Sequence, residues 1–300
     1  MMMSESSLKA TIFVSLIIIL QLVSTTELHA RAQIIKITCD QKEQNNVTEF
    51  NQNFVNMTDL LAAQMQNSSI GTASIGTGPD SNFGLAQCYG DLSTEDCILC
   101  YTEARKVVPH CYPSNGGRIY LDGCFTRFQT YNFFEEYTGP DDTYVCGNET
   151  RKSMAFQDTV KLAMSNAVTN ALRNKEYFGK DQMLVSGNGN WNGNVNEFVY
   201  VLANCWGTLS PSSCSACLAN ATASVSKCLP WSEGRALNTG CFLRYSDTNF
   251  HNPVLDTGRA INKKVNWKTI VLCVLGAVGS VVFVTSCGFA IRWFEKRNYL

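Results

Sequence analysis

The chain has 300 residues, with 24 basic and 25 acidic side chains and a formal net charge of −1. This near balance, without a long basic run, gives no electrostatic footprint for nucleic acid, so we expect no nucleic-acid partner. The length corresponds to about two ordinary domains. The fourteen cysteines make a disulfide framework the first question to settle.

The N-terminal segment has the layout of a secretory signal peptide. Lys9 precedes an apolar run at 11–23, and a small-residue site follows at Ala30-Arg31-Ala32. This order predicts a signal peptide over 1–32 that is removed from the mature chain. Cleavage after Ala32 leaves Gln33 first, and cleavage after Ala30 is the alternative.

The first half of the remaining chain contains signals for helices followed by strands. Apolar residues at helical spacing predict a helix over 53–66. Ser93 opens a capping-box sequence, which predicts a helix to about Val108. The run at 117–129 is typical of strands.

The second half shows the same order of signals. Ser210 is the expected N-cap of a helix whose first position is Pro211. A further helix is predicted at 153–173, a loop at 186–194, and strands at 196–207 and 234–245. Helices and short strands without β-α-β alternation predict α+β domains, each an antiparallel sheet packed with two helices.

The cysteine spacings reveal an internal duplication. Five cysteines from Cys88 to Cys124 are separated by 9, 3, 11 and 13 positions, and those from Cys205 to Cys241 repeat the same intervals. One further cysteine precedes each block, at Cys39 and Cys146. The ectodomain is therefore predicted to be two homologous domains, at 33–140 and 141–250, with six cysteines and three disulfides each.

The C-terminal apolar segment is long enough to cross a bilayer. Residues 269–291 carry no charge, and Trp267 and Trp293 flank them as interfacial aromatics would. Together with the signal peptide, this predicts a single-pass type I membrane protein with a stalk at 251–268 and a cytosolic tail at 292–300.

Two features of the predicted span could support function. Gly276 and Ser280 form a small-x-x-x-small pattern that favours helix association. Cys287 lies near the cytosolic boundary and is a candidate for S-acylation. Packing and an inert membrane cysteine are the structural alternatives.

Five sequons lie in the part predicted to be extracellular. Their asparagines are candidate N-glycosylation sites, at Asn46, Asn56, Asn67, Asn148 and Asn220.

The sequence contains no group of residues with the spacing typical of a catalytic or metal-binding site. The two C-x-x-C pairs are more than a hundred residues apart, and few histidines accompany them, which argues against zinc and favours structural bridges over a redox dithiol. The pairs Glu135-Glu136 and Asp141-Asp142 are interpreted as solvated. The large aromatics are interpreted as packing residues: Tyr89, Tyr120, Trp206 and Trp231. No enzyme activity, metal or cofactor is expected.

The C-x8-C-x2-C motifs at 88–100 and 205–217, inside two six-cysteine domains, resemble the plant ginkbilobin-type domain. With the signal peptide, span and short tail, the chain resembles the plasmodesmata-located proteins along essentially its whole length. The resemblance implies bonds between the first and fifth, second and third, and fourth and sixth cysteines of each domain: Cys39–Cys111, Cys88–Cys97, Cys100–Cys124, Cys146–Cys228, Cys205–Cys214 and Cys217–Cys241.

The resemblance also implies candidate sugar-binding positions. A ginkgo seed relative binds mannose through an asparagine, an arginine and a glutamate. The matching positions here are Asp40, Arg118 and Gln129, then Gly147, Arg235 and Ser246. Only the arginines are retained, so Arg118 and Arg235 are candidates for a ligand-binding or a structural role, and cell-wall carbohydrate is left open as a partner.

The function implied by the resemblance is non-enzymatic. The protein would lie in the plasma membrane at plasmodesmata with its ectodomain in the apoplast. It would regulate cell-to-cell trafficking through callose deposition and defence signalling. Expected partners are family members, receptor-like kinases, other membrane or cell-wall proteins, and viral movement proteins. The alternatives are a plasma-membrane co-receptor, an apoplastic carbohydrate-binding protein, and a thiol oxidoreductase.

Overall fold

The computed structural model describes residues 31–42, 44–185 and 197–252. Most of the predicted signal peptide, the loop at 186–194, the span at 269–291 and the tail at 292–300 lie outside these residues, as do Gly276, Ser280 and Cys287. Within the described ranges, no helix combines the length and apolarity needed to cross a membrane.

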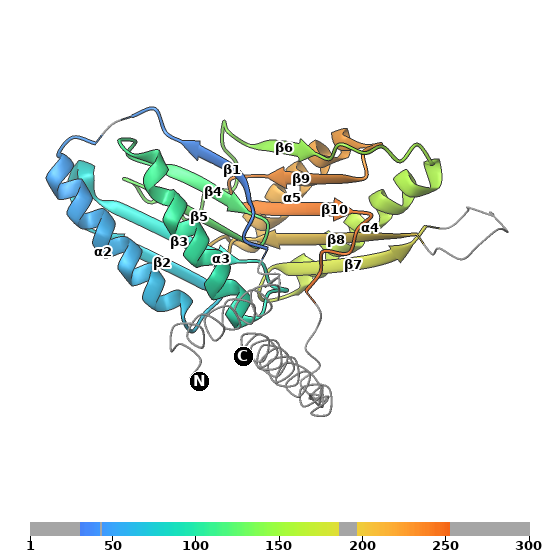
Figure 1. Ribbon diagram of the computed structural model, residues 1–300, viewed down its shortest axis with the longest axis horizontal. Coiled ribbons are helices and arrows are strands. Elements are labelled where there is room, and N and C mark those ends of the chain that lie inside the picture. The colour runs from blue at the N-terminus through green and yellow to red at the C-terminus, as the bar shows by residue number, and fades with distance from the viewer. Residues whose placement is uncertain (1–30, 43, 186–196, 253–300) are drawn as a thin grey trace, which may run out of the picture. The chain divides into compact units, whose positions relative to one another are not determined.

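Each half of the described chain forms a five-stranded antiparallel sheet with two helices (Figure 1). The sheet orders are β1-β4-β5-β3-β2 and β6-β9-β10-β8-β7, so the second copy repeats the topology of the first. In the first copy the elements are β1 (Ile34–Cys39), α2 (Val47–Met65), β2 (Ile70–Ile75), β3 (Asn82–Cys88), α3 (Thr94–Val107), β4 (Gly117–Leu121) and β5 (Cys124–Gln129). In the second they are β6 (Thr143–Cys146), α4 (Met154–Arg173), β7 (Phe178–Leu184), β8 (Phe198–Cys205), α5 (Pro211–Val225), β9 (Glu233–Leu237) and β10 (Cys241–Ser246).

Polar N-cap side chains mark the first residues of the helices. Ser93 accepts a hydrogen bond from the Asp96 backbone N–H, and Ser210 accepts one from Ser213, so both predicted N-caps are confirmed. Helix α2 begins at Val47, earlier than the predicted residue 53. Asn46 caps it by accepting from the backbone N–H groups of Thr48 and Glu49. The apolar spacing located most of the buried residues of α2 but not its first turns, which include the buried Phe50.

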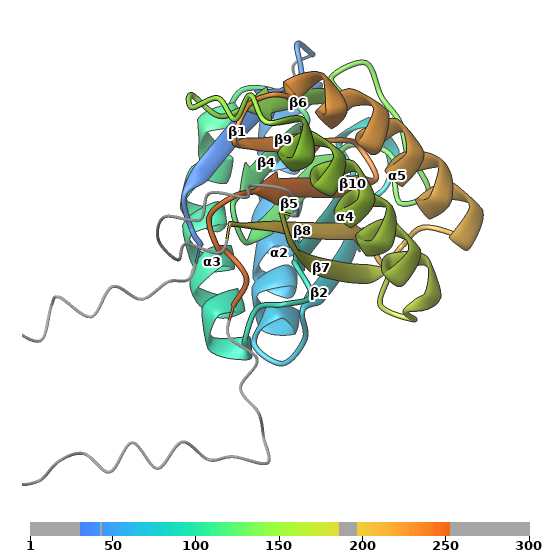
Figure 2. The same cartoon turned by 90° about the vertical axis from the view of Figure 1, so that its right-hand side faces the viewer.

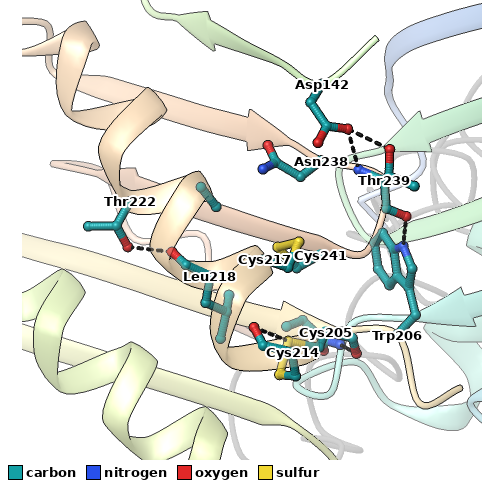
Figure 3. Close-up of a disulfide and its surroundings, with 12 residues drawn as sticks. Asp142, Cys205, Trp206, Cys214, Cys217, Leu218, Thr222, Asn238, Thr239 and Cys241 are labelled. Carbon is teal, nitrogen blue, oxygen red and sulfur yellow. Dashed lines mark hydrogen bonds between the residues drawn. A yellow bond between two sulfur atoms is a disulfide. The ribbon is translucent and has the colours of Figure 1, made fainter. Parts of the chain in front are cut away.

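Three disulfides in each copy fasten the second helix and the 3-10 turn after it to strands of the sheet, in the pairs that the family resemblance implied. Cys88–Cys97 joins the end of β3 to the start of α3, and Cys100–Cys124 joins α3 to β5. Cys39–Cys111 ties β1 to the short 3-10 turn after α3. The second copy has the equivalent bonds Cys146–Cys228, Cys205–Cys214 and Cys217–Cys241. The last two of these bonds are drawn in Figure 3.

Three apolar clusters hold the described chain together. One lies between the helices and sheet of the first copy, and one lies in the same place in the second. The third joins the two copies, and its members come from both sheets. Each sheet therefore has its helices on one face and the other copy on its opposite face, with α2 and α3 on one side and α4 and α5 on the other (Figure 2).

Candidate functional site

The face that each sheet turns toward the other copy carries the two candidate arginines. Side chains alternate along a strand, so Ile119 and Leu121 of β4 enter the helix-side core, while Arg118 and Tyr120 lie on the opposite face. On this face Tyr120 joins the cluster shared by both copies. The candidate site is thus the contact between the copies.

Two aromatic stacks form the centre of this contact, and they are related by the repeat. The Phe125 and Trp206 rings lie 4.2 Å apart and 2° from parallel. Their counterparts, Phe242 and Tyr89, lie 4.3 Å apart and 11° from parallel. The interpretation of Tyr89, Tyr120 and Trp206 as packing residues is confirmed, since all three are at most 3% exposed, and Trp206 also donates to the Thr239 carbonyl (Figure 3).

Two polar side chains form reciprocal hydrogen bonds between the copies. Gln87 accepts a hydrogen bond from the Gly207 backbone N–H at 2.8 Å, and its counterpart Asn204 accepts one from Gly90 at 3.0 Å. Each copy therefore satisfies a backbone donor of the other. The contact has the form of an isologous dimer interface inside one chain.

In the second copy, two buried arginines share two carboxylates. Arg235 of β9 lies directly opposite Arg244 of β10. Asp122, from the β4–β5 turn of the first copy, binds Arg235 at 3.1 Å and Arg244 at 2.6 Å. Glu233 binds the same two arginines at 3.0 and 3.3 Å. Burial alone would lower the pKa of Arg235, but these carboxylates outweigh it and raise that pKa.

The first copy has the same arginine pair with different partners. Arg118 lies opposite Arg127, and the counterpart of Asp122 is Thr239, whose hydroxyl accepts from Arg118 at 2.9 Å. Asp142 lies 4.0 Å from Arg118 and accepts two hydrogen bonds from Thr239 (Figure 3). Arg127 binds Glu136 at 2.6 Å and lies over the Phe133 ring. Burial, with a further contribution from Arg118, lowers the pKa of Arg127.

These contacts correct the interpretation of the acidic pairs as solvated for Glu136 and Asp142, whereas Glu135 is exposed as expected. Glu136 binds Arg127, Asp142 binds Thr239, and Glu135 accepts from the Ser210 backbone N–H. Only Asp141 stays exposed without a described contact. Local sequence patterns do not indicate the contacts of Asp142 and Glu135, because their partners are 97 and 75 residues away along the chain.

The positions that match the mannose ligands share one end of each sheet but do not form equal sites. In the first copy, the Asp40 and Gln129 side chains both lie against Gly116, closely enough to meet any side chain there. In the second copy Glu233 takes the place of Gly116 and packs against Gly147. Arg118 and Arg235 are engaged with Thr239 and with Asp122 and Glu233, so neither offers an open guanidinium.

The chain leaving each sheet crosses to the other copy. After β5, Phe133 covers Arg127, and the Phe134 carbonyl accepts from Thr208. After β10, the counterpart Phe250 covers Arg244 at 3.9 Å, and Asn252 binds Asp91 and Asp96. The predicted stalk therefore has its first two residues, 251 and 252, packed on the domains.

The remaining candidate residues are either exposed on the surface or bonded in disulfides. All five sequon asparagines are exposed, as glycan attachment requires. All twelve cysteines in the described residues are in disulfides, which leaves the oxidoreductase alternative no thiol pair there. No group of three or more potential metal ligands occurs among the described residues.

The family model for salt stress response/antifungal proteins, Stress-antifung, matches residues 38–131 and 145–248. The chain belongs to this family, and the two matched segments are the two copies described above.

Relatives of the chain include a receptor-like protein kinase and a plasmodesmata-located protein. The chain is 48% identical over 270 residues to cysteine-rich receptor-like protein kinase 2 of Arabidopsis thaliana, covering 90% of this chain but 40% of that protein. It is 26% identical over 277 residues to plasmodesmata-located protein 1 of the same species, covering 88% of each. The chain thus spans less than half the length of the receptor-like kinase relatives that it matches.

Solved structures show the same fold. The tandem DUF26 ectodomain of the Arabidopsis thaliana cysteine-rich receptor-like protein PDLP8 matches with a TM-score of 0.57 and 23% identity, covering 73% of this chain and all of that one. The ectodomain of PDLP5 matches with a TM-score of 0.56 and 22% identity. The described residues therefore have the tandem fold of these two ectodomains.

Proposed function

We propose that the two copies act as one extracellular binding module of a plasma-membrane protein, with Arg118 and Arg235 as structural residues of the contact between them. The observation that carries this proposal is the reciprocal packing of the two sheets. Burying the arginines there leaves the outer surfaces, on the helices and sheet edges, for partners.

The finer proposal places this protein at plasmodesmata as a type I membrane protein that regulates cell-to-cell trafficking. The match to plasmodesmata-located protein 1 over 88% of both chains supports it. Callose deposition, defence signalling and docking of viral movement proteins belong to this proposal, with receptor-like kinases and family members as its membrane partners.

Imaging the full chain with a C-terminal fluorescent fusion, beside a callose stain, tests this placement. We expect puncta at cell walls that coincide with callose, and faster spread of a free fluorescent tracer when the gene is silenced. A uniform signal along the plasma membrane with unchanged tracer spread would contradict it. A fusion with Ser280→Leu tests the small-residue pattern of the span in the same assay.

The second candidate is a receptor or co-receptor ectodomain at the general plasma membrane. The 48% identity with a receptor-like kinase over 90% of this chain favours it. Uniform localisation, together with ligand-dependent co-purification of a receptor-like kinase, would select this candidate. Specific binding on a glycan array that is lost in Arg118→Gln would instead revive the carbohydrate-binding alternative.

A further inference from the structure

The first and last described residues of the chain meet at one buried carboxylate. Asp91 lies in the loop before α3, and its side chain is 0% exposed. One of its oxygens binds the Arg31 guanidinium, and the other accepts from the Asn252 backbone N–H at 3.2 Å. These three residues, called here the Asp91 clamp, join the start of the chain to the end of the second copy.

Arg31 is built into this clamp. Its side chain is 7% exposed, and its guanidinium carbon lies 6.0 Å from the Phe250 ring. Phe250 also covers Arg244, and the Asn252 side chain donates to Asp96 at 2.7 Å. Arg31 therefore contributes to holding the segment that leads toward the predicted stalk.

Asp91 depends on Arg31 for charge balance. A buried carboxylate is tolerated when it is paired and costly when its cation is removed. Without Arg31, one backbone N–H would be the only remaining described partner of Asp91. At the matching position the second copy has Thr208, which is neutral and binds the Phe134 carbonyl, so only the first copy has this requirement.

The expected signal-peptide cleavage decides whether Arg31 is present. Small residues at Ala30 and Ala32 favour a cut after Ala32, which would remove the cation of the clamp. A cut after Ala30 retains it. The backbone of Arg31 has φ of +43°, a left-handed conformation unfavourable for arginine. That constraint disappears when Arg31 is the first residue, because φ involves the preceding carbonyl.

We propose that the signal peptide is cleaved between Ala30 and Arg31, so that the mature chain begins with Arg31 and processing itself supplies the cation of the Asp91 clamp. Hydrolysis of that peptide bond adds one water, leaving a carboxylate on Ala30 and an amine on Arg31.

Labelling the N-terminus of the secreted full chain, followed by peptide mass spectrometry, tests the cleavage position. We expect labelled peptides that begin at Arg31. Peptides that begin at Gln33, or an uncleaved chain, would overturn the proposal. This readout is independent of where the protein is found in the membrane, so it can fail while the proposed function stands.

A series of full chains with fixed first residues tests the clamp. A foreign leader directs the start to Arg31, Ala32 or Gln33, and thermal unfolding is followed in detergent by tryptophan fluorescence. We expect the Arg31 chain to melt about 5 °C above the other two, which should agree with each other. Equal melting of all three would overturn the role of Arg31.

Substitutions separate charge from chain length. In the chain that begins at Arg31, Arg31→Gln should lower Tm by about as much as deletion, and Asp91→Asn added to it should restore part of the loss. The control is Lys42→Gln, which removes an exposed cation from the same copy and should leave Tm unchanged. A similar loss in the control, or no restoration by Asp91→Asn, would contradict the pairing.

Discussion

The two copies contain the same pair of facing arginines but neutralise it in different ways. In the second copy, Asp122 and Glu233 each reach both Arg235 and Arg244. In the first, Arg127 has Glu136, while Arg118 has a hydroxyl and a carboxylate 4.0 Å away. The same pair of arginines can therefore be neutralised by a closed four-residue network, or by separate partners from the segment between the copies and from the β9–β10 turn.

The largest effect should come from opening the closed network. Asp122→Asn leaves the largely buried Arg235 and Arg244 with Glu233 as their only carboxylate among the described residues. This change should lower the free energy of unfolding by about 3 kcal/mol. Urea unfolding measures it, with the exposed Asp141→Asn as the control. A loss below about 1 kcal/mol would mean that the network is no stronger than the partners in the first copy.

A smaller effect is expected from giving the first copy the residue of the second. Thr239→Asp places a carboxylate beside Arg118 but also against Asp142, so it should destabilise the protein by about 1–2 kcal/mol. Adding Asp142→Asn removes the repulsion and should recover most of the loss. If the double variant is as unstable as the single one, the geometry rather than the charge distinguishes the two pairs.

Glu136→Gln should lower the free energy of unfolding by a smaller amount. Glu136 is 37% exposed, so solvent screens its pairing with Arg127 and the expected loss is about 1 kcal/mol. Glu103→Gln, which affects an exposed pair within α3, is the matched control and should change stability little. A loss from Glu136→Gln equal to that from Asp122→Asn would remove the contrast between the copies.

The smallest effect concerns pH. Burial lowers the pKa of His251, whose ring nitrogen lies 3.0 Å from the Val201 carbonyl. A lowered folded pKa favours the neutral ring, so its contribution is present above the unfolded pKa of about 6.5 and is lost as pH falls toward the folded value. His251→Gln should therefore make urea stability fall less steeply below pH 6.5, whereas an identical slope would contradict burial of the ring.

The sequence predicts the local features of this fold because their causes are local. Cysteine intervals showed the duplication, and serine caps located α3 and α5. Strands β1, β2, β6 and β7 were not predicted individually, since edge strands depend on pairing with distant residues. Strand β3, which lies inside its sheet between β5 and β2, was not predicted either. The disulfide pairs required the family resemblance, because spacing alone permits fifteen pairings per domain.

The candidate site was predicted in part. The repeat identified Arg118 and Arg235, but not that both face the contact between the copies. The roles of Asp122 and Asp142 were missed because their partners are distant in sequence. Glu136 meets Arg127 only nine residues away, and its role was missed because the acidic pair was interpreted as solvated. The available signal would have been matched positions at which only one copy has an acidic residue, such as Asp122 and Thr239.

The reciprocal contact also has a consequence for how the protein can change over time. In a dimer of identical subunits every substitution occurs on both sides of the symmetry axis, and its cost is doubled. Because both halves here are encoded in one chain, each side of the interface varies independently. An aspartate can persist at 122 while a threonine stands at 239, so covalent fusion permits two unequal halves to specialise without separating.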